Sequence, residues 1–257
     1  DGAGRPGATG AALPTRRAPE DDLGFIRTNG PDSLSCLSCH NDPEPGGAGD
    51  FLANVFVLAQ ERGHDVFTID SEAVNERGTT EMHGAGLIEL LAREMTSELL
   101  DIRSIALSEA ASSGGKIRKE LLTKGVSFGA ITAFPDGNVD TNEVEGVAKD
   151  LVIRTWSQKG TNISIREFTI SALNHHHGMQ AVERYGFTQT GTRDFDQDFV
   201  VDELTEGDIT ALIVYQAVLP PPLQIIPKDP AFAAAVEHGE EVFNSIGCSS
   251  CHINKMV

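Results

Sequence analysis

The sequence predicts a mainly α-helical fold with long irregular loops and little β-structure. Apolar residues recur at three- and four-residue steps from Gly84 to about Ala111, the pattern of one long amphipathic helix. Further helices are predicted over about 165–185, 205–218 and 230–246. The stretches between them are rich in Gly, Asp, Asn and Thr, which favour turns.

Start and stop signals support these helices. The long helix is expected to end at the run Ser112-Ser113-Gly114-Gly115. The segment from there to Gly160 is interpreted as loops and a small hairpin, with short β-like pieces at 126–128 and 151–155. Residues 51–58 are mostly apolar, and their periodicity leaves a strand and a helical turn equally open.

The two C-terminal helices carry the clearest caps. Thr205 and Asp208 form a variant of the capping box, and a run of three prolines begins after Leu219. Asp229 and the proline after it suit the start of the last helix, because Asp caps and Pro fits the first turn. Gly247 is expected to close that helix.

Two C-x-x-C-H motifs use all four cysteines of the chain: Cys36, Cys39 and His40 in the first, Cys248, Cys251 and His252 in the second. This is the attachment signature of c-type haem, in which both thiols bond to the porphyrin and the adjacent imidazole binds the iron. A chance pattern, a zinc site or a redox C-x-x-C would explain one copy. Two copies predict a di-haem c-type cytochrome with helical, cytochrome c-like haem domains.

The domain organisation follows from the motifs. Residues 1–20 read as a flexible N-terminal arm, and residues 21–219 as a first haem domain with helical and loop insertions. A Pro-rich linker covers 220–229. Residues 230–257 read as the start of a second cytochrome c-like domain, which we expect to be incomplete because so few residues follow the second motif.

Charge and compartment limit the partners. The formal charge is -18, from 38 acidic and 20 basic residues, which disfavours nucleic acid and anionic membranes and favours a small basic electron carrier. The acidity could equally serve solubility alone. No apolar run is long enough to span a bilayer. Haem is attached outside the cytoplasm, so we expect an exported, periplasmic or extracellular chain whose signal peptide has been removed.

The segment Arg166–Gln180, with the sequence REFTISALNHHHGMQ, resembles the di-haem oxidoreductase, putative peroxidase family, relatives of bacterial di-haem cytochrome c peroxidases. Residues 84–89, 140–146 and 243–252 are also similar, and the likeness runs from about Ser35 to the end. It implies an enzyme in which electrons pass between two haems to hydrogen peroxide. The alternative is a non-catalytic electron-transfer cytochrome or a subunit of a larger multi-haem assembly.

The ligand opposite each proximal histidine would decide between these functions. A distal His or Met gives a six-coordinate electron-transfer haem, whereas an open position permits peroxide chemistry. The candidates are Met82, His83, His175, His176, His177 and Met179. His83 is well placed for a loop ligand, because it stands just before the long helix.

The three consecutive histidines cannot all face one iron in an α-helix, where neighbours lie about 100° apart. His175 shares a face with Met179, and His176 shares another with Gln180. One could bind iron while another contacts a propionate or moves protons. The alternative is that they are surface or capping residues.

Glu89, His83 and Trp156 are the candidate catalytic residues. Peroxide cleavage needs an acid-base side chain over the iron, and Glu89 on the long helix could serve, as could Glu94. Solvated charges on a polar face are the simpler interpretation of both. Trp156, the only tryptophan, could relay electrons or merely fill a core.

An acidic segment predicts a possible calcium site. Carboxylates at alternate positions can converge on one hard cation. The candidate ligands are Asp194, Asp196, Asp198, Asp202 and Glu203. Phe199 stands where calcium loops usually have Gly, and Thr205 where they have Glu. An acidic solvated loop is the equally weighted alternative.

Overall fold

The computed structural model describes residues 35–49, 55–58, 74–157, 160–195, 199–253 and 256. The chain divides into two compact units. The first joins residues 1–90 with 154–221, and the second joins 91–153 with 222–257. Within the described residues, no helix is long and apolar enough to cross a membrane. The predicted arm over 1–20 lies outside the described residues.

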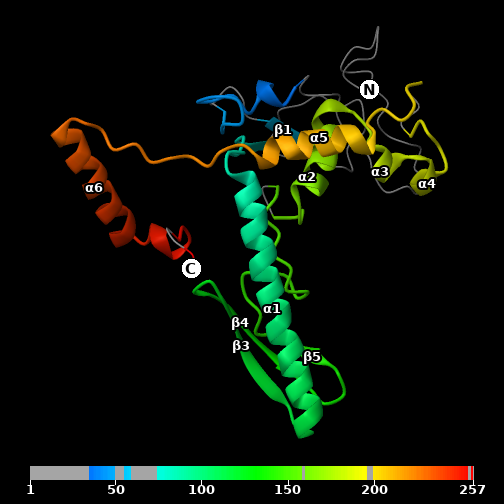
Figure 1. The fold of residues 1–257 in the computed structure, drawn as a ribbon, viewed down its shortest axis with the longest axis vertical. Coiled ribbons are helices and arrows are strands. Elements are labelled where there is room, and N and C mark those ends of the chain that lie inside the picture. The colour runs from blue at the N-terminus through cyan, green and yellow to red at the C-terminus, as the bar shows by residue number, and fades with distance from the viewer. Residues whose placement is uncertain are drawn as a thin grey trace. The chain divides into compact units, whose positions relative to one another are not determined.

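The second unit is built on a long helix and an antiparallel sheet. Helix α1 (Ala85–Ser113) begins in the first unit and continues into the second, where it runs along the sheet (Figure 1). The sheet has the order β3-β4-β5 and consists of β3 (Ile117–Thr123), β4 (Val126–Ala133) and β5 (Val139–Asp140). Its strands pair antiparallel, with Thr123 opposite Val126 at the tight end of the first hairpin.

The turn of that hairpin explains its register. Lys124 and Gly125 connect the strands with positive φ angles of 50° and 77°. Two such residues in succession are typical of the type I′ turn, whose twist matches that of the flanking strands. Lys124 also forms ion pairs with Glu94 and Glu98 of α1, which fasten the turn to the helix.

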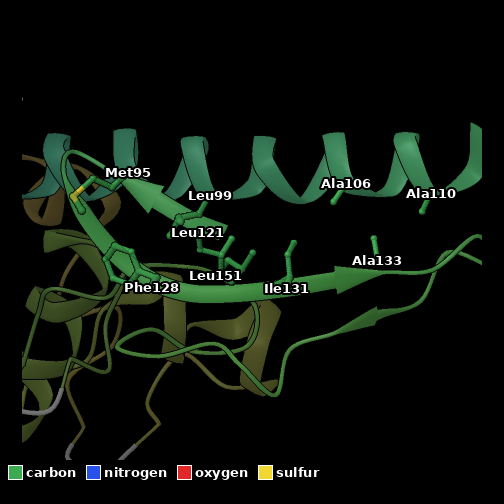
Figure 2. Close-up of a cluster of buried hydrophobic side chains, with 9 residues drawn as sticks. All are labelled: Met95, Leu99, Ala106, Ala110, Leu121, Phe128, Ile131, Ala133 and Leu151. Atoms are coloured by element: carbon green, nitrogen blue, oxygen red, sulfur yellow. The ribbon is translucent and has the colours of Figure 1, made fainter. Parts of the chain in front are cut away.

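The core of this unit lies between helix and sheet. Figure 2 shows small and medium apolar side chains of α1 facing those of β3 and β4. The buried members are Met95, Leu99, Ala106, Ala110, Leu121, Phe128, Ile131, Ala133 and Leu151. Leu99, Leu121 and Leu151 are fully buried, so the face of α1 that the sequence predicts to be apolar is the one that packs on the sheet.

The prediction of a mainly α-helical fold with little β-structure is therefore wrong. The segment after α1, predicted as loops and a small hairpin, contains the strands β3, β4 and β5, whereas the predicted strand at 151–155 does not form. Strand β3 contains Lys, Glu and Leu, which prefer helices. Its inward positions, Ile117, Lys119, Leu121 and Thr123, are nevertheless the less exposed ones, and their packing on α1 overrides local propensity.

The first unit contains a two-stranded antiparallel sheet and several short helices. Strands β1 (Val55–Leu58) and β2 (Val74–Arg77) form the sheet, so the segment at 51–58 includes a strand. The helices are α2 (Ile165–Ala172), the π-helical turn η4 (Leu173–His177), α3 (Val182–Tyr185), α4 (Phe187–Thr190) and α5 (Glu206–Ala217). Helices α2 and α5 pack together around Ile209, Ile170 and Leu173.

The predicted continuous helix over 165–185 is wrong, whereas the two C-terminal helices are confirmed. Helix α2 changes into the wider η4 turn, which ends at Gly178 with a φ of 70°. Helix α5 begins with the predicted capping box of Thr205 and Asp208. Helix α6 (Pro230–Ser245) begins at its Asp229 cap and is followed by a residue with positive φ, Gly247.

Candidate haem sites

Both C-x-x-C-H motifs fold into the same backbone turn. Each starts with a short 3₁₀ helix, η2 (Cys36–Ser38) and η5 (Cys248–Ser250). In each, the N–H of the histidine donates to the carbonyl of the first cysteine at 2.9 Å. The second cysteines also agree, with φ and ψ of -116° and -38° at Cys39 and -112° and -34° at Cys251. The two motifs therefore share one backbone conformation at the positions that carry the thiols and the imidazole.

The imidazole of the first motif is oriented by the backbone. The Nδ1 atom of His40 lies 3.3 Å from the carbonyl oxygen of Gly47. A carbonyl can only accept, so Nδ1 carries the proton and Nε2 keeps its lone pair. This is the tautomer that a metal-binding histidine needs, with the second nitrogen held by a backbone acceptor.

The surroundings also favour the neutral form of His40. Burial is the largest influence and lowers the pKa of His40. Hydrogen bonds to the carbonyls of Gly47 and Thr80 oppose it. The charge of His176 lowers the pKa of His40 further, while that of Glu81 raises it. The neutral imidazole is the form that binds metal.

The loop after the first motif is packed against the segment before α1. The N–H of Gly46 donates to the carbonyl of His40 at 3.0 Å, and the N–H of Met82 donates to the carbonyl of Gly46 at 2.8 Å. Gly46 has a φ of 98°, and a Cβ there would come within 3.2 Å of His83 Nε2. The loop and the segment 82–83 thus form one layer beside His40.

His83 is held in this layer by carboxylates. Its side chain is 8% exposed, its Nδ1 contacts Glu81, and its Nε2 lies 3.8 Å from Glu44. Met82, the neighbouring candidate ligand, is buried. His83 therefore contacts both the loop after the first motif, at Glu44, and the segment before α1, at Glu81.

The η4 turn brings histidines to the first motif. His177 is 6% exposed, and its Nε2 lies 3.9 Å from Cys36 Sγ. Burial raises the pKa of the Cys36 thiol. A π-helical turn is wider than an α-helical one, so neighbouring side chains diverge less around it. The charge of His176, in the same turn, lowers the pKa of His40. The side chain of His175 lies outside the described part of the structure.

The other candidates are engaged elsewhere in the first unit. Met179 packs against the core of α2 and α5. Glu89 accepts the N–H of Ile165 at 2.6 Å and so supports the start of α2. Trp156 is 6% exposed and packs with Phe168, their ring centroids 6.3 Å apart. These contacts are those of structural residues, and they leave the catalytic prediction untested.

The second motif has different neighbours. The ring of Phe243 on α6 meets that of His252 edge-on, with centroids 6.0 Å apart. The helix before the second motif thus brings an aromatic ring against the histidine of the motif. Helix α6 buries none of its side chains, and Phe232 and Ile246 are well exposed. The described surroundings of the second motif are thus open, unlike those of the first.

The predicted calcium ligands are only partly described, because Asp196 and Asp198 lie outside the described residues. Asp194 accepts the N–H of Phe199 at 3.0 Å, and Asp202 forms an ion pair with Arg193. Glu203 accepts the N–H of Gln180. These carboxylates bind protein donors, which leaves calcium as a prediction.

Haem fits the first motif on the chemistry of its donors. Two thiols stand at the attachment spacing, the His40 ring is held at Nδ1 by a backbone carbonyl, and a buried histidine-bearing turn lies beside them. Within the described residues, no group of three or more His, Cys, Asp or Glu is arranged to hold a bare metal ion.

Two features of this site escape the sequence reasoning. The contacts of Gly47 with His40 and of Glu81 with His83 depend on loop packing, and no periodicity or motif in the sequence predicts them. The π-helical turn has a signal in hindsight, because Asn174 and Gly178 flank the histidines and both residue types favour helix ends.

Comparisons with protein-family models, curated proteins and solved structures found no match. The functional assignment therefore depends on the residues of this chain.

Proposed function

We propose that the chain is a di-haem c-type cytochrome, a redox protein of the di-haem peroxidase class that passes electrons between two haems and on to hydrogen peroxide. The observation that carries the proposal is the common turn of the two C-x-x-C-H motifs, whose histidine N–H bonds are both 2.9 Å long. Equal geometry at two places 212 residues apart, counted from Cys36 to Cys248, supports one shared use. A zinc site would need four converging ligands.

The chain's own residues account for attachment and orientation. The thiols of Cys36 and Cys39 add to vinyl groups, each sulfur bonding one vinyl carbon while its hydrogen goes to the other, so no oxidant is consumed. His40 would be the iron ligand of the first haem, with its ring held by the Gly47 carbonyl. Bound haem supplies one-electron transfer and, where a coordination position is open, reduction of peroxide to water.

The reduction of peroxide requires electrons and protons that the chain itself does not supply. Reducing hydrogen peroxide to two waters takes two electrons and two protons. The electrons would come from a one-electron carrier, and the charge of -18 favours a small basic protein in that role. Such carriers and covalent haem attachment belong outside the cytoplasm, so we also propose a periplasmic or extracellular location.

A second function is favoured by the histidines beside the first motif. His177 Nε2 lies 3.9 Å from Cys36 Sγ, and the histidines of the η4 turn would be candidate distal ligands of a haem at the first motif. Two six-coordinate haems would make the protein an electron-transfer cytochrome or a subunit of a larger multi-haem assembly. The two functions differ in one property, which is whether either iron reacts with peroxide.

The attachment test uses the full chain made with a cytochrome c maturation system. Intact mass and haem staining of the denatured protein should show two haems. Replacing Cys36 and Cys39 by Ala, or Cys248 and Cys251 by Ala, should remove one haem each. The matched controls Ser38→Ala and Ser250→Ala change only intervening residues and should keep both. A protein with thiols free after maturation would overturn the proposal.

The peroxide test starts from the protein with both haems attached. The half-reduced protein is mixed with hydrogen peroxide and a reduced basic carrier, and carrier oxidation is followed by absorbance. Peroxide-dependent oxidation, with a high-spin ferric signal in the electron paramagnetic resonance spectrum, is expected for the peroxidase. Two low-spin haems without turnover would reject the peroxidase and leave the electron-transfer cytochrome.

Calcium binding is a separate proposal for the acidic segment. Added calcium should raise the unfolding temperature, because a ligand that binds the folded state stabilises it. Asp194→Asn should remove that increase, and Asp136→Asn, in the β4–β5 turn, is the control. The same increase in both variants would place calcium elsewhere or show a general ionic effect.

A further inference from the structure

We propose that the exposed apolar residues Phe199, Val200 and Val201, here called the 199–201 patch, form the docking surface for the basic electron carrier of the first haem. The inference rests on the proposed function, since it requires haem at the first motif. It goes further by placing the carrier on one surface and by stating the chemistry of the partner, a basic protein with an apolar contact area.

The 199–201 patch consists of three successive apolar residues that all face solvent. Phe199 is 85% exposed, Val200 42% and Val201 51%. Single exposed apolar side chains are common on soluble proteins, whereas an uninterrupted run of them is typical of a surface that binds something. The patch therefore has the composition of a contact area for a partner.

Contacts anchor the chain before and after the patch. The side chain of Phe195 is buried. Asp202 forms an ion pair with Arg193 and donates its N–H to the Arg193 carbonyl at 3.0 Å. Phe199 has a φ of 75° and donates its N–H to Asp194 Oδ2 at 3.0 Å. The exposed position of the Phe199 ring is thus supported by specific contacts of its backbone.

The charge beside the patch selects the kind of partner. From Phe199 to Asp208 the sequence contains four carboxylates and no basic side chain. Glu206 and Asp208 are exposed in the first turn of α5. Negative charge next to an apolar centre is complementary to a basic protein, and it disfavours a second copy of this chain, which would bring the same charges.

The patch is joined to the first motif by a short series of contacts. Glu203, just after the patch, accepts the N–H of Gln180. Gln180 follows His177 by three residues, and His177 Nε2 lies 3.9 Å from Cys36 Sγ. A carrier docked on the patch would pass one electron to the ferric iron of the first haem. The carrier is oxidised and the iron becomes ferrous, with no bond formed or broken.

A second exposed apolar segment provides the matched control. Ile225 is 84% exposed, almost the same as Phe199. Residues 219–228 contain Lys228 and no carboxylate. Ile225 therefore matches Phe199 in exposure but lacks the acidic neighbours that a basic partner requires.

The binding test uses the full chain with both haems attached. The probe is mitochondrial cytochrome c, a small basic one-electron carrier, and its affinity is measured by titration calorimetry at low ionic strength. A chelator keeps calcium out of the measurement. Phe199→Asn removes the ring, and asparagine tolerates positive φ, so the change adds no backbone strain. Ile225→Asn is the control, and both variants should unfold at the wild-type temperature.

Phe199→Asn should weaken binding of the probe about tenfold or more, because a phenylalanine side chain loses its burial in the complex. Phe199→Tyr keeps the ring and should bind as wild type does, as should Ile225→Asn. Glu206→Gln should slow association by about two- to fivefold and reduce its dependence on salt. Glu240→Gln, on the exposed helix α6, should leave the association rate unchanged.

Electron exchange is measured with the first haem alone attached, after Cys248→Ala and Cys251→Ala. Phe199→Asn should lower the second-order rate constant for exchange with the probe about tenfold, in parallel with the affinity. An unchanged rate constant would separate the patch from electron transfer and overturn the proposal.

Other results would also overturn it. The probe might bind with equal affinity to wild type and Phe199→Asn, or fail to bind saturably, and either result would reject the docking surface while the attached haems uphold the proposed function. Equal weakening by Phe199→Asn and Ile225→Asn would show a general loss of apolar surface. A dimer in sedimentation that Phe199→Asn abolishes would assign the patch to a second copy. A protein without covalent haem by intact mass would refute the proposed function itself.

Discussion

Gly129 offers a quantitative test of how the second unit is built. It lies within β4 with a φ of 76°, and a Cβ there would come 1.9 Å from the carbonyl oxygen of Glu143. Residues 143–145 cross over β4 at this point. Two hydrogen bonds, each 3.0 Å long, join them to the strand, one from Ala130 N–H to the Glu143 carbonyl and one from Glu145 N–H to the Phe128 carbonyl. Gly129→Ala must displace this crossing and weaken both bonds.

The control is Gly125→Ala in the hairpin turn, because Gly125 has a nearly equal φ of 77° but nothing within 4 Å of its Cβ position. Left-handed backbone costs an alanine about 1–2 kcal/mol. Alanine also lowers the conformational entropy of the unfolded chain, which stabilises the folded protein by about 0.4–1 kcal/mol. Gly125→Ala should therefore lower the free energy of unfolding by about 1 kcal/mol. Two hydrogen bonds of about 1 kcal/mol each bring the loss for Gly129→Ala to about 3 kcal/mol.

Urea unfolding followed by far-ultraviolet circular dichroism measures both losses. The analysis requires equal m-values, so that the difference in midpoint reports stability. Equal losses in the two variants, within about 0.5 kcal/mol, would refute the close crossing of 143–145 over β4.

Three further changes have outcomes that follow from single contacts. Thr205→Ala removes the cap of α5 and should cost about 1–2 kcal/mol in thermal unfolding; an unchanged melting temperature would refute the cap. Hydrogen bonds from Thr123 and Lys124 lower the pKa of Glu98, so its stabilisation is present above the ordinary pKa of glutamate, about 4.3, and is lost as the pH falls further. Glu98→Gln should flatten this acid dependence of urea unfolding, and a slope equal to wild type would contradict it. Under the proposed function, Gly47→Ala places a Cβ 2.0 Å from the carbonyl oxygen of Asp42, displaces the Gly47 backbone and should alter the ferric haem spectrum while leaving the haem covalently attached; an unchanged spectrum would show that the Gly47 carbonyl does not orient the His40 ring.

Features encoded by neighbouring residues are predictable from this sequence. The caps at Thr205 and Asp229 and the start and end of α1 need only local patterns, and they are confirmed. The hairpin also has a local signal, Lys124-Gly125, but the helix-favouring composition of β3 conceals it. Local secondary-structure propensity cannot predict the core between α1 and β4, because the residues that make its contacts are far apart in the sequence.

The candidate site likewise has features that the local sequence predicts and features that depend on the folded structure. Spacing alone indicates the thiols and His40, because attachment chemistry fixes their separation. The ring orientation of His40 depends on the Gly47 carbonyl, and the approach of His177 depends on a π-helical turn. An α-helix over that stretch would direct neighbouring histidines about 100° apart, and the wider π-helical turn reduces that divergence.

The two motifs share a turn but differ in their environments, and that difference has a consequence for electron transfer. His40 is half-buried, its Nδ1 is held by a carbonyl, and Glu81 adds a negative charge nearby. His252 is exposed and meets only an aromatic edge among its described ring contacts. Burial, hydrogen bonding of the axial ligand and nearby charge are the means by which a protein sets a haem potential. Under the proposed function, identical attachment chemistry would thus yield two unequal potentials, and electrons passing between the haems would have a preferred direction.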